Sequence, residues 1–222
     1  MNTRATGDRI KLQRLAQQLG SRGIKDEKVL AAMRSVPREP FVEEGLRAQA
    51  YSEASLPIGE QQTISQPWIV ARMCELAGPD FGGRVLEIGT GSGYHASVLS
   101  RLFEQVYSVE RIVSLSQKAR GNVRALGIEN VHFKIFDGGY GWSEFAPYKA
   151  VIVAAAAPEI PTPLIDQLEE GGKLIVPLAD ERPSAQRNQK LVRVIKRESG
   201  NVTEDHGPCR FVPLTGKFGW SR

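Results

Sequence analysis

Three glycines in the stretch of residues 84–102, R-V-L-E-I-G-T-G-S-G-Y-H-A-S-V-L-S-R-L, have the spacing of a nucleotide-binding turn. The apolar run 85–88 before them is typical of a buried parallel strand, and the apolar positions of 98–103 after them indicate a helix. Because Gly89, Gly91 and Gly93 lack a Cβ atom, the backbone there can bend sharply and approach a ligand closely. A strand, a glycine turn and a helix in this order predict a nucleotide site.

The residues around the turn indicate which nucleotide it binds. The dinucleotide fingerprint G-x-G-x-x-G/A requires a small residue at its last position, where this chain has Tyr94. The glycines run G-x-G-x-G around Thr90, and Glu87 stands two residues before the first of them. A carboxylate there suits a cofactor with a cationic sulfonium and an amino-acid tail. We therefore predict S-adenosyl-L-methionine as the cofactor.

Two further acids stand at the ends of later apolar runs. Glu110 closes the run 106–109, where a strand-end carboxylate can accept hydrogen bonds from two ribose hydroxyls. Asp137 follows the run 131–136 in the same way. Ligands of open parallel sheets bind at the carboxyl ends of the strands. We therefore expect Glu87, Glu110 and Asp137 on one rim of a sheet.

Strands and helices alternate from residue 84 onward, which predicts a parallel sheet covered by helices. The predicted strands are 85–88, 106–110, 131–136, 150–155 and 173–178, with helices at 112–126 and 164–168, the latter ended by Gly171-Gly172. Two extended runs, 191–196 and 209–214, flank a turn at 200–201 and predict an antiparallel edge, while 179–189 is expected to be a surface loop. The fold class is thus α/β, a doubly wound, mostly parallel sheet (Rossmann-like methyltransferase fold) with an N-terminal helical extension and an antiparallel C-terminal edge.

The N-terminal third is expected to be helical with one long connection. Helical spacing covers 9–19 and 26–36, where Asp26 is a plausible N-cap, and a further helix begins at Pro67 and ends at Gly78. The segment 40–66 shows little periodicity and is expected to be a long irregular loop of functional importance. We divide the chain into an N-terminal helical and substrate-loop extension, residues 1–79, and a cofactor-binding methyltransferase domain, residues 80–222.

Composition narrows the class of protein. The chain has 222 residues, 41% of them apolar, enough for one sizeable core. Its net charge is +4, but the cations are interspersed with acids, so we expect no nucleic-acid partner. No stretch reaches the roughly 18 apolar residues of a membrane helix, and there is no apolar signal sequence, so we expect no membrane association and a cytoplasmic location. Cys74 and Cys209 have no metal-site spacing and are expected to be reduced thiols, with no bound metal. We expect a monomer.

The segment after the strand 150–155 bears on the acceptor of the methyl group. Many methyltransferases that act on nucleic acids or amines have an Asn/Asp-Pro-Pro-aromatic turn there, whereas this chain has A-A-A-A-P from Ala154 to Pro158. None of these side chains can form a hydrogen bond. A carboxylate acceptor needs no base because it is already an anion at neutral pH. The enzyme's contribution would then be to align one oxygen with the methyl group and to exclude water.

Five segments together closely resemble the protein-L-isoaspartate O-methyltransferase family over nearly the whole chain. They are L-P-I-G-E-Q-Q-T-I-S-Q-P-W-I-V-A-R-M at 56–73, V-L-E-I-G-T-G-S-G-Y at 85–94, Y-S-V-E-R-I at 107–112, A-P-E-I-P at 157–161 and R-F-V-P-L at 210–214. The T-I-S-x-P element is the most specific. The resemblance implies methylation of the free α-carboxyl of L-isoaspartyl residues in damaged proteins or peptides, with D-aspartyl residues as a further substrate class of the family. The ester then closes to a succinimide, whose hydrolysis returns some normal aspartate.

The resemblance also implies roles for individual residues. The active-site serine falls on Ser65. The substrate-binding positions fall on Thr63, Ile64, Gln66 and Val212, and the cofactor-binding positions on Glu87, Gly89, Thr90, Gly91, Gly93, Glu110, Arg111, Asp137 and Gly138. Three residues depart from the family's usual pattern, namely Gln61, Phe136 and Ala154. The ring of Phe136 is expected to pack in the core under the strand, with a position beside the adenine as the alternative.

Other interpretations fit part of the sequence. Ser65 also stands where a helix N-cap is expected, and the two roles are compatible. A methyltransferase of the same fold that acts on another small carboxylate or on nucleic acid would explain the three acids but not the T-I-S-Q-P loop. A non-catalytic S-adenosylmethionine-binding protein is a second alternative. A nicotinamide oxidoreductase is a distant third because of Tyr94.

Overall fold

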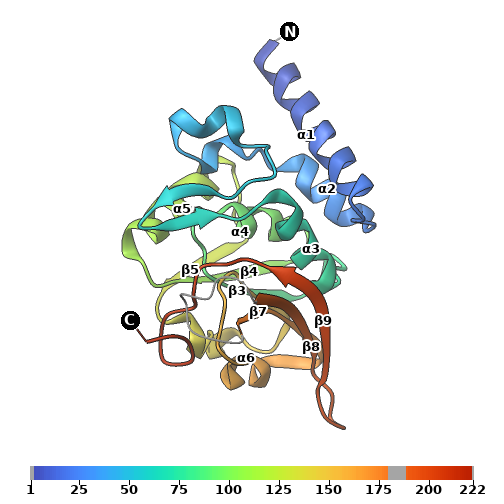
Figure 1. Ribbon diagram of the computed structural model, residues 1–222, viewed down its shortest axis with the longest axis vertical. Coiled ribbons are helices and arrows are strands. Elements are labelled where there is room, and N and C mark those ends of the chain that lie inside the picture. Colours follow the sequence, from blue (N-terminus) through green and yellow to red (C-terminus); the bar gives the residue numbers. More distant parts are fainter. Residues whose placement is uncertain (1–2, 180–188, 222) are drawn as a thin grey trace.

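A computed structural model describes residues 3–179 and 189–221, and a single seven-stranded sheet lies at its centre (Figure 1). The strand order is β5-β4-β3-β6-β7-β8-β9. The pairs from β5 to β7 are parallel, and β8 and β9 add an antiparallel edge. The strands are β3 (Arg84–Ile88), β4 (Gln105–Glu110), β5 (Val131–Ile135), β6 (Tyr148–Val153), β7 (Leu168–Ala179), β8 (Gln189–Ile195) and β9 (Val202–Cys209). The predicted fold class is confirmed.

Side chains of the central strands enter two apolar clusters, one on each face of the sheet. In β3, Val85 packs into the first cluster, and Leu86 and Ile88 pack into the second. This follows from the two-residue period of a strand, which sends successive side chains to opposite faces. The helices α3 (Pro67–Ala77), α4 (Tyr94–Leu99) and α5 (Val113–Ala125) contribute to the first cluster, and α6 (Thr162–Asp166) contributes to the second. The sheet is therefore covered on both faces.

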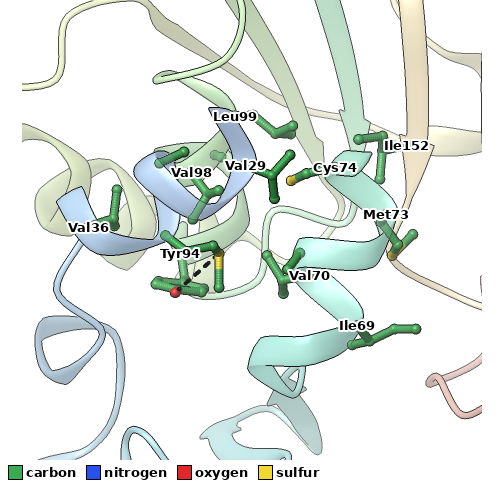
Figure 2. Close-up of a cluster of buried hydrophobic side chains, with 14 of the residues drawn as sticks. Val29, Val36, Ile69, Val70, Met73, Cys74, Tyr94, Val98, Leu99 and Ile152 are labelled. Carbon is green, nitrogen blue, oxygen red and sulfur yellow. Dashed lines mark hydrogen bonds between the residues drawn. The ribbon is translucent and has the colours of Figure 1, made fainter. Parts of the chain in front are cut away.

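Two N-terminal helices, α1 (Thr3–Ser21) and α2 (Glu27–Ser35), pack beside α3, and α1 projects from the body of the molecule (Figure 1). The Asp26 side chain accepts hydrogen bonds from the backbone N–H groups of Lys28 and Val29, which confirms it as the N-cap of α2. Gly78, with φ of 66°, ends α3 in the left-handed conformation, as predicted. Figure 2 shows how α2, α3 and α4 meet: Val29 of α2, Val36 directly after α2, Val70 of α3 and Tyr94 of α4 belong to one buried cluster.

The segment 40–66 is more ordered than the sequence predicted. It contains two short 3₁₀ helices, η1 (Glu39–Phe41) and η2 (Glu44–Gln49), and an antiparallel hairpin of β1 (Leu56–Gly59) and β2 (Gln62–Ile64). The sequence did not indicate the hairpin, because its turn is formed by Glu60 and Gln61 rather than by the Asn-Gly pair that favours this geometry. Glu60 and Gln61 have φ of 53° and 56°.

Two other boundaries differ from the prediction. The glycines at 171–172 do not end α6 but lie inside β7, which begins at Leu168. The antiparallel edge strand is β9, not 209–214, because pairing with β8 stabilises the polar residues of 202–209. Of the predicted surface loop 179–189, residues 180–188 lie outside the described part of the chain. Within the described residues, no helix combines the length and apolarity that a bilayer span requires.

Candidate active site

A pocket of about 880 Å³, including its open mouth, lies at the carboxyl ends of β3 and β4. Four segments far apart in the sequence form most of its lining: 62–65 at the hairpin, 88–92 at the glycine turn, 109–112 after β4, and 212–215 near the C-terminus. The pocket therefore has one wall from the N-terminal third and one from the end of the described chain.

The glycine turn has the backbone conformation that its sequence predicted. Gly89, Gly91 and Gly93 have φ of 94°, 53° and 87°, a region that residues with a Cβ atom adopt at a cost. A Cβ atom at Gly93 would lie 3.2 Å from both the Cβ and the carbonyl oxygen of Ala119 in α5, so glycine also permits the close packing of this helix. Gly89, Thr90 and Gly91 line the pocket, whereas Gly93 lies behind it.

Glu110 is the last residue of β4, it lines the pocket, and its carboxylate is held in place from two sides. Its Oε2 accepts a hydrogen bond from the Gly91 N–H at 3.0 Å, and its Oε1 accepts one from the Ile112 N–H at 2.9 Å. The side chain is 6% exposed. These bonds fix the acid against the glycine turn at the strand end. Arg111, which follows it, also lines the pocket.

Asp137 follows β5, but its carboxylate is bound by the main chain. Oδ1 accepts a hydrogen bond from the Gly139 N–H at 3.0 Å, and Oδ2 accepts one from the Lys217 N–H at 2.8 Å. Gly138, rather than Asp137, lines the pocket. Asp137 therefore anchors the C-terminal segment next to the site.

The core position expected for Phe136 is wrong. Its ring is 45% exposed and lies with its centroid 5.7 Å from that of Tyr140. The Lys134 ammonium lies 4.7 Å from the centre of the Phe136 ring. The cause is that Phe136 follows the last residue of β5, which is an edge strand, and has left the sheet that would have buried it.

Glu87 does not line the pocket but is buried beneath it with no exposed surface. Its Oε2 accepts a hydrogen bond from the Ser108 hydroxyl, which lies next to the Thr90 hydroxyl. Burial raises the pKa of the Glu87 carboxyl to about 8. The carboxyl is therefore mainly protonated at neutral pH, unlike the carboxylate that the sequence suggested for a cationic ligand.

Ser65 lines the pocket together with Thr63, Ile64 and Val212. The alternative role of Ser65 as a helix cap is wrong, because the N-cap of α3 is Gln66 and no side chain caps this helix. Gln66 itself is exposed and lies outside the pocket lining. Ser65 and Val212, which are 147 positions apart, are therefore brought to one pocket, as predicted.

His95 lines the pocket and was missed by the sequence analysis, which offered no signal beyond its place after the glycine turn. Its Nε2 lies 3.4 Å from the Cys74 sulfur, and its Nδ1 lies 3.9 Å from Glu87 Oε1. Burial lowers the pKa of His95 to about 4, so the ring is neutral at pH 7. Both nitrogens are near buried groups below the pocket.

The pocket lining also includes Ala154 and Ala155, whose side chains have no polar atom. Among the described residues that line the pocket, the titratable side chains other than the cation Arg111 are His95, Glu110 and Tyr94. Glu110 is held by two N–H groups, His95 adjoins buried groups, and burial raises the pKa of Tyr94 to about 12. The arrangement therefore fits an acceptor that is already an anion.

The residues present also fit the predicted cofactor. Because the glycines of the turn have no side chain, a ligand can contact the main chain there directly. Gly138 is needed for packing, since a Cβ atom at this position would lie 2.3 Å from Cγ2 of Ile88, which lines the pocket. Glu110 provides a fixed carboxylate at the strand end, where ribose hydroxyls are bound in folds of this type. A nucleoside with an amino-acid tail matches this combination.

Comparison with known proteins gives one consistent result. Residues 10–219 match the family model of protein-L-isoaspartate(D-aspartate) O-methyltransferase. The protein-L-isoaspartate O-methyltransferase of Geobacter metallireducens is 51% identical over 204 residues, which cover 91% of this chain and 92% of the relative. That of Desulfosudis oleivorans is 47% identical over 212 residues, 96% of this chain and 94% of the relative.

Solved structures agree with the sequence comparison. A protein-L-isoaspartate O-methyltransferase superposes with a TM-score of 0.83 at 35% identity, covering 93% of this chain and 66% of that chain. A Plasmodium falciparum protein assigned to the same activity, solved with S-adenosyl-L-homocysteine, gives a TM-score of 0.77 at 25% identity, covering 92% of this chain and 98% of that chain. Because the family model matches residues 10–219 of the 222-residue chain, this chain belongs to the protein-L-isoaspartate O-methyltransferase family.

Proposed function

We propose that this enzyme transfers a methyl group from S-adenosyl-L-methionine to the free α-carboxyl of L-isoaspartyl residues in damaged proteins and peptides. The methyl ester is more readily attacked than the free carboxylate, because methanol leaves from it far more easily than oxide or hydroxide leaves from the acid. The neighbouring main-chain nitrogen can therefore displace methanol and close a succinimide, whose hydrolysis returns some normal aspartate. Other methyltransferase substrates and a non-catalytic binding role are not favoured, because relatives of about 50% identity over most of the chain carry the isoaspartyl activity in their names.

The observation that carries this proposal is that Ser65, Val212 and Ala154 line the same pocket. Together they offer one hydroxyl for orientation and no free base, which matches a carboxylate acceptor and does not match an amine or an alcohol, whose proton must be removed. Rate enhancement would come from alignment and from exclusion of water.

We assign the cofactor to the side of the pocket formed by the glycine turn and Glu110. Glu110 would accept hydrogen bonds from the ribose hydroxyls, while Gly89, Thr90 and Gly91 would let the main chain contact the amino-acid tail. Arg111 and Gly138 would border the adenosyl group. The cofactor supplies an electrophilic methyl group on a sulfonium. Glu87, Gly93 and Asp137 would act from behind the lining, by supporting the turn and the C-terminal segment.

We assign the peptide to the opposite side, between the hairpin loop and the C-terminal segment. Ser65 would hydrogen-bond the acceptor carboxylate and turn one oxygen toward the methyl group. Thr63, Ile64 and Val212 would contact the flanking peptide. Gln66, which is exposed, would meet the peptide outside the pocket.

The two proposed segments of the chain would have different roles. Residues 1–79 would form a helical and substrate-loop extension, and residues 80–222 would form the cofactor-binding domain, which also contributes Val212. We further propose a cytoplasmic monomer without nucleic-acid or membrane partners. In support, one chain supplies both sides of the pocket, and Cys74 and Cys209 are free thiols.

Methyl incorporation from labelled S-adenosyl-L-methionine tests the assignment. Two peptides of identical sequence, one with isoaspartate and one with aspartate, should differ sharply, with label entering the isoaspartyl peptide and leaving it again as methanol. Equal labelling of the two peptides, or labelling of neither, would refute the repair function.

A further inference from the structure

Arg38 is a buried cation placed directly behind the loop that carries Ser65. It follows α2, and none of its surface is exposed. Its Nη2 donates a hydrogen bond to the main-chain oxygen of Ser65 at 2.5 Å. The centre of its guanidinium lies 4.7 Å from the centroid of the Tyr94 ring. A single side chain thus contacts both the substrate loop and the residue that follows the glycine turn.

A contribution to stability does not explain why Arg38 is buried with so few polar partners. The Nε and Nη1 atoms of Arg38 are buried and have no hydrogen-bond partner within the described chain. The charge of Glu53 favours the guanidinium, but Glu53 forms an ion pair with Arg22 at 2.5 Å, and Glu39 accepts hydrogen bonds from Lys11 and Tyr51. Burial accordingly lowers the pKa of the guanidinium. Replacing an imperfectly paired buried charge by an apolar side chain of similar volume is often neutral or stabilising.

The two groups that Arg38 contacts belong to the same pocket. Ser65 and Tyr94 both line it, whereas Arg38 does not. Tyr94 is rigid, because its ring is buried between α2 and α3, as Figure 2 shows, and packs edge-on against Phe41 with centroids 5.4 Å apart. Arg38 therefore ties the main chain at Ser65 to a fixed aromatic surface.

We propose that Arg38 is a positioning residue that holds the Ser65 loop in its substrate-binding conformation before the peptide arrives. This inference rests on the proposed function. The acceptor carboxylate loses its charge on methylation, so a cation touching it would stabilise the substrate more than the transition state. Arg38 avoids this by acting from behind the Ser65 carbonyl. Its benefit is a preformed loop, which spares the peptide the entropic cost of ordering it.

The test replaces the charge by an apolar side chain of similar length. Arg38→Met should raise KM for the isoaspartyl peptide about tenfold, with kcat changed less than about twofold, equivalent to about 1.4 kcal/mol of binding. Its melting temperature should equal or exceed that of the wild type, and its affinity for S-adenosyl-L-methionine should be unchanged. Hydrogen exchange should increase at residues 62–66 in the absence of any peptide. Arg38→Lys, which keeps the charge and one donor, should give intermediate KM and exchange.

Arg120→Met is the matched control. Arg120 also donates a hydrogen bond to a main-chain oxygen, that of Phe133 at 2.7 Å, but it is exposed and does not line the pocket. Its KM and the exchange at 62–66 should equal those of the wild type.

The outcomes separate this inference from the proposed function. A wild type that does not discriminate isoaspartate from aspartate refutes the function. If the wild type discriminates, the inference is overturned by Arg38→Met with unchanged KM and exchange, or with lowered stability and cofactor affinity together. If Arg38→Met is insoluble, Arg38→Lys decides: raised KM with unchanged cofactor affinity supports the inference, and wild-type values of both overturn it.

Discussion

Ser65 is the residue whose replacement separates binding of the cofactor from use of the substrate. Because Ser65 lines the side of the pocket that we propose for the peptide and caps no helix, Ser65→Ala should leave S-adenosyl-L-methionine affinity unchanged. It should lower kcat/KM for isoaspartyl peptide by about tenfold to a hundredfold, equivalent to roughly 1.4–3 kcal/mol of lost orientation. Initial rates at varied peptide concentration measure this. Ser52→Ala, which removes an exposed hydroxyl bonded to the Gln49 oxygen, is the control. A Ser65→Ala enzyme with normal activity would remove the hydroxyl from the mechanism.

Glu110 should be the main polar determinant of cofactor affinity. Glu110→Gln keeps the size of the side chain but removes its charge and one acceptor, so S-adenosyl-L-methionine binding should weaken by roughly 1.5–3 kcal/mol, the range for hydrogen bonds to a charged group. Titration calorimetry measures the change. The exposed Glu104→Gln should bind normally. Equal affinities for the Glu110 and Glu104 variants would contradict the ribose assignment.

Glu87 makes stability depend on pH. Its folded-state pKa of about 8 lies above the ordinary value near 4.3, so the folded state binds more protons than the unfolded state between these values. The stability contribution of the protonated carboxyl is therefore complete below about pH 4.3 and is lost as the pH rises toward 8. Glu87→Gln stays neutral at every pH. The melting temperature of the variant relative to that of the wild type should therefore rise as the pH rises from about 4.3 to 8, by about 2–4 °C for each kcal/mol of stability that the wild type loses. Melting curves from pH 5 to 8.5 test this, and a pH-independent difference would contradict it.

At the scale of elements, the β1–β2 hairpin holds a strained residue at its tip. Gln61 has φ of 56°, which costs about 1–2 kcal/mol for a residue with a Cβ atom. Gln61→Gly removes this strain but adds about 0.5–1 kcal/mol of unfolded-state entropy. The melting temperature should therefore rise by about 1–4 °C. Gln62→Gly, one position later inside β2, should lower it. If both variants lower the melting temperature equally, the turn is not strained.

Elements that are buried on both faces could be predicted from the sequence, and those held by pairing could not. The strands β3, β4 and β6 are nearly continuous apolar runs, so their composition alone indicates them. In contrast, β9 contains Thr203, Glu204 and Asp205, and its only stabilising neighbour in the sheet is β8. A polar edge strand of this kind is stabilised by pairing with its neighbour, and the residues of the strand itself do not reveal that pairing. The same is true of β2, which has three residues.

The candidate site shows the same division at longer range. The glycine turn and Glu110 were predictable because their function depends on local backbone geometry. The anchoring of Asp137 by the Lys217 N–H, 80 positions away, was not, and neither was the contact of Arg38 with Ser65, 27 positions away. Contacts of this kind depend on how the whole chain packs, and no local pattern records them.

At the scale of the whole molecule, the pocket closes on segments from opposite ends of the chain. The pocket-lining loop at 62–65 is made early in synthesis, and the pocket-lining segment at 212–215 is made after every described strand of the sheet. A chain still attached to the ribosome can therefore complete its sheet and its glycine turn while one side of the pocket is missing. Repair activity should appear abruptly, when the last wall emerges, rather than grow gradually with the length of the nascent chain.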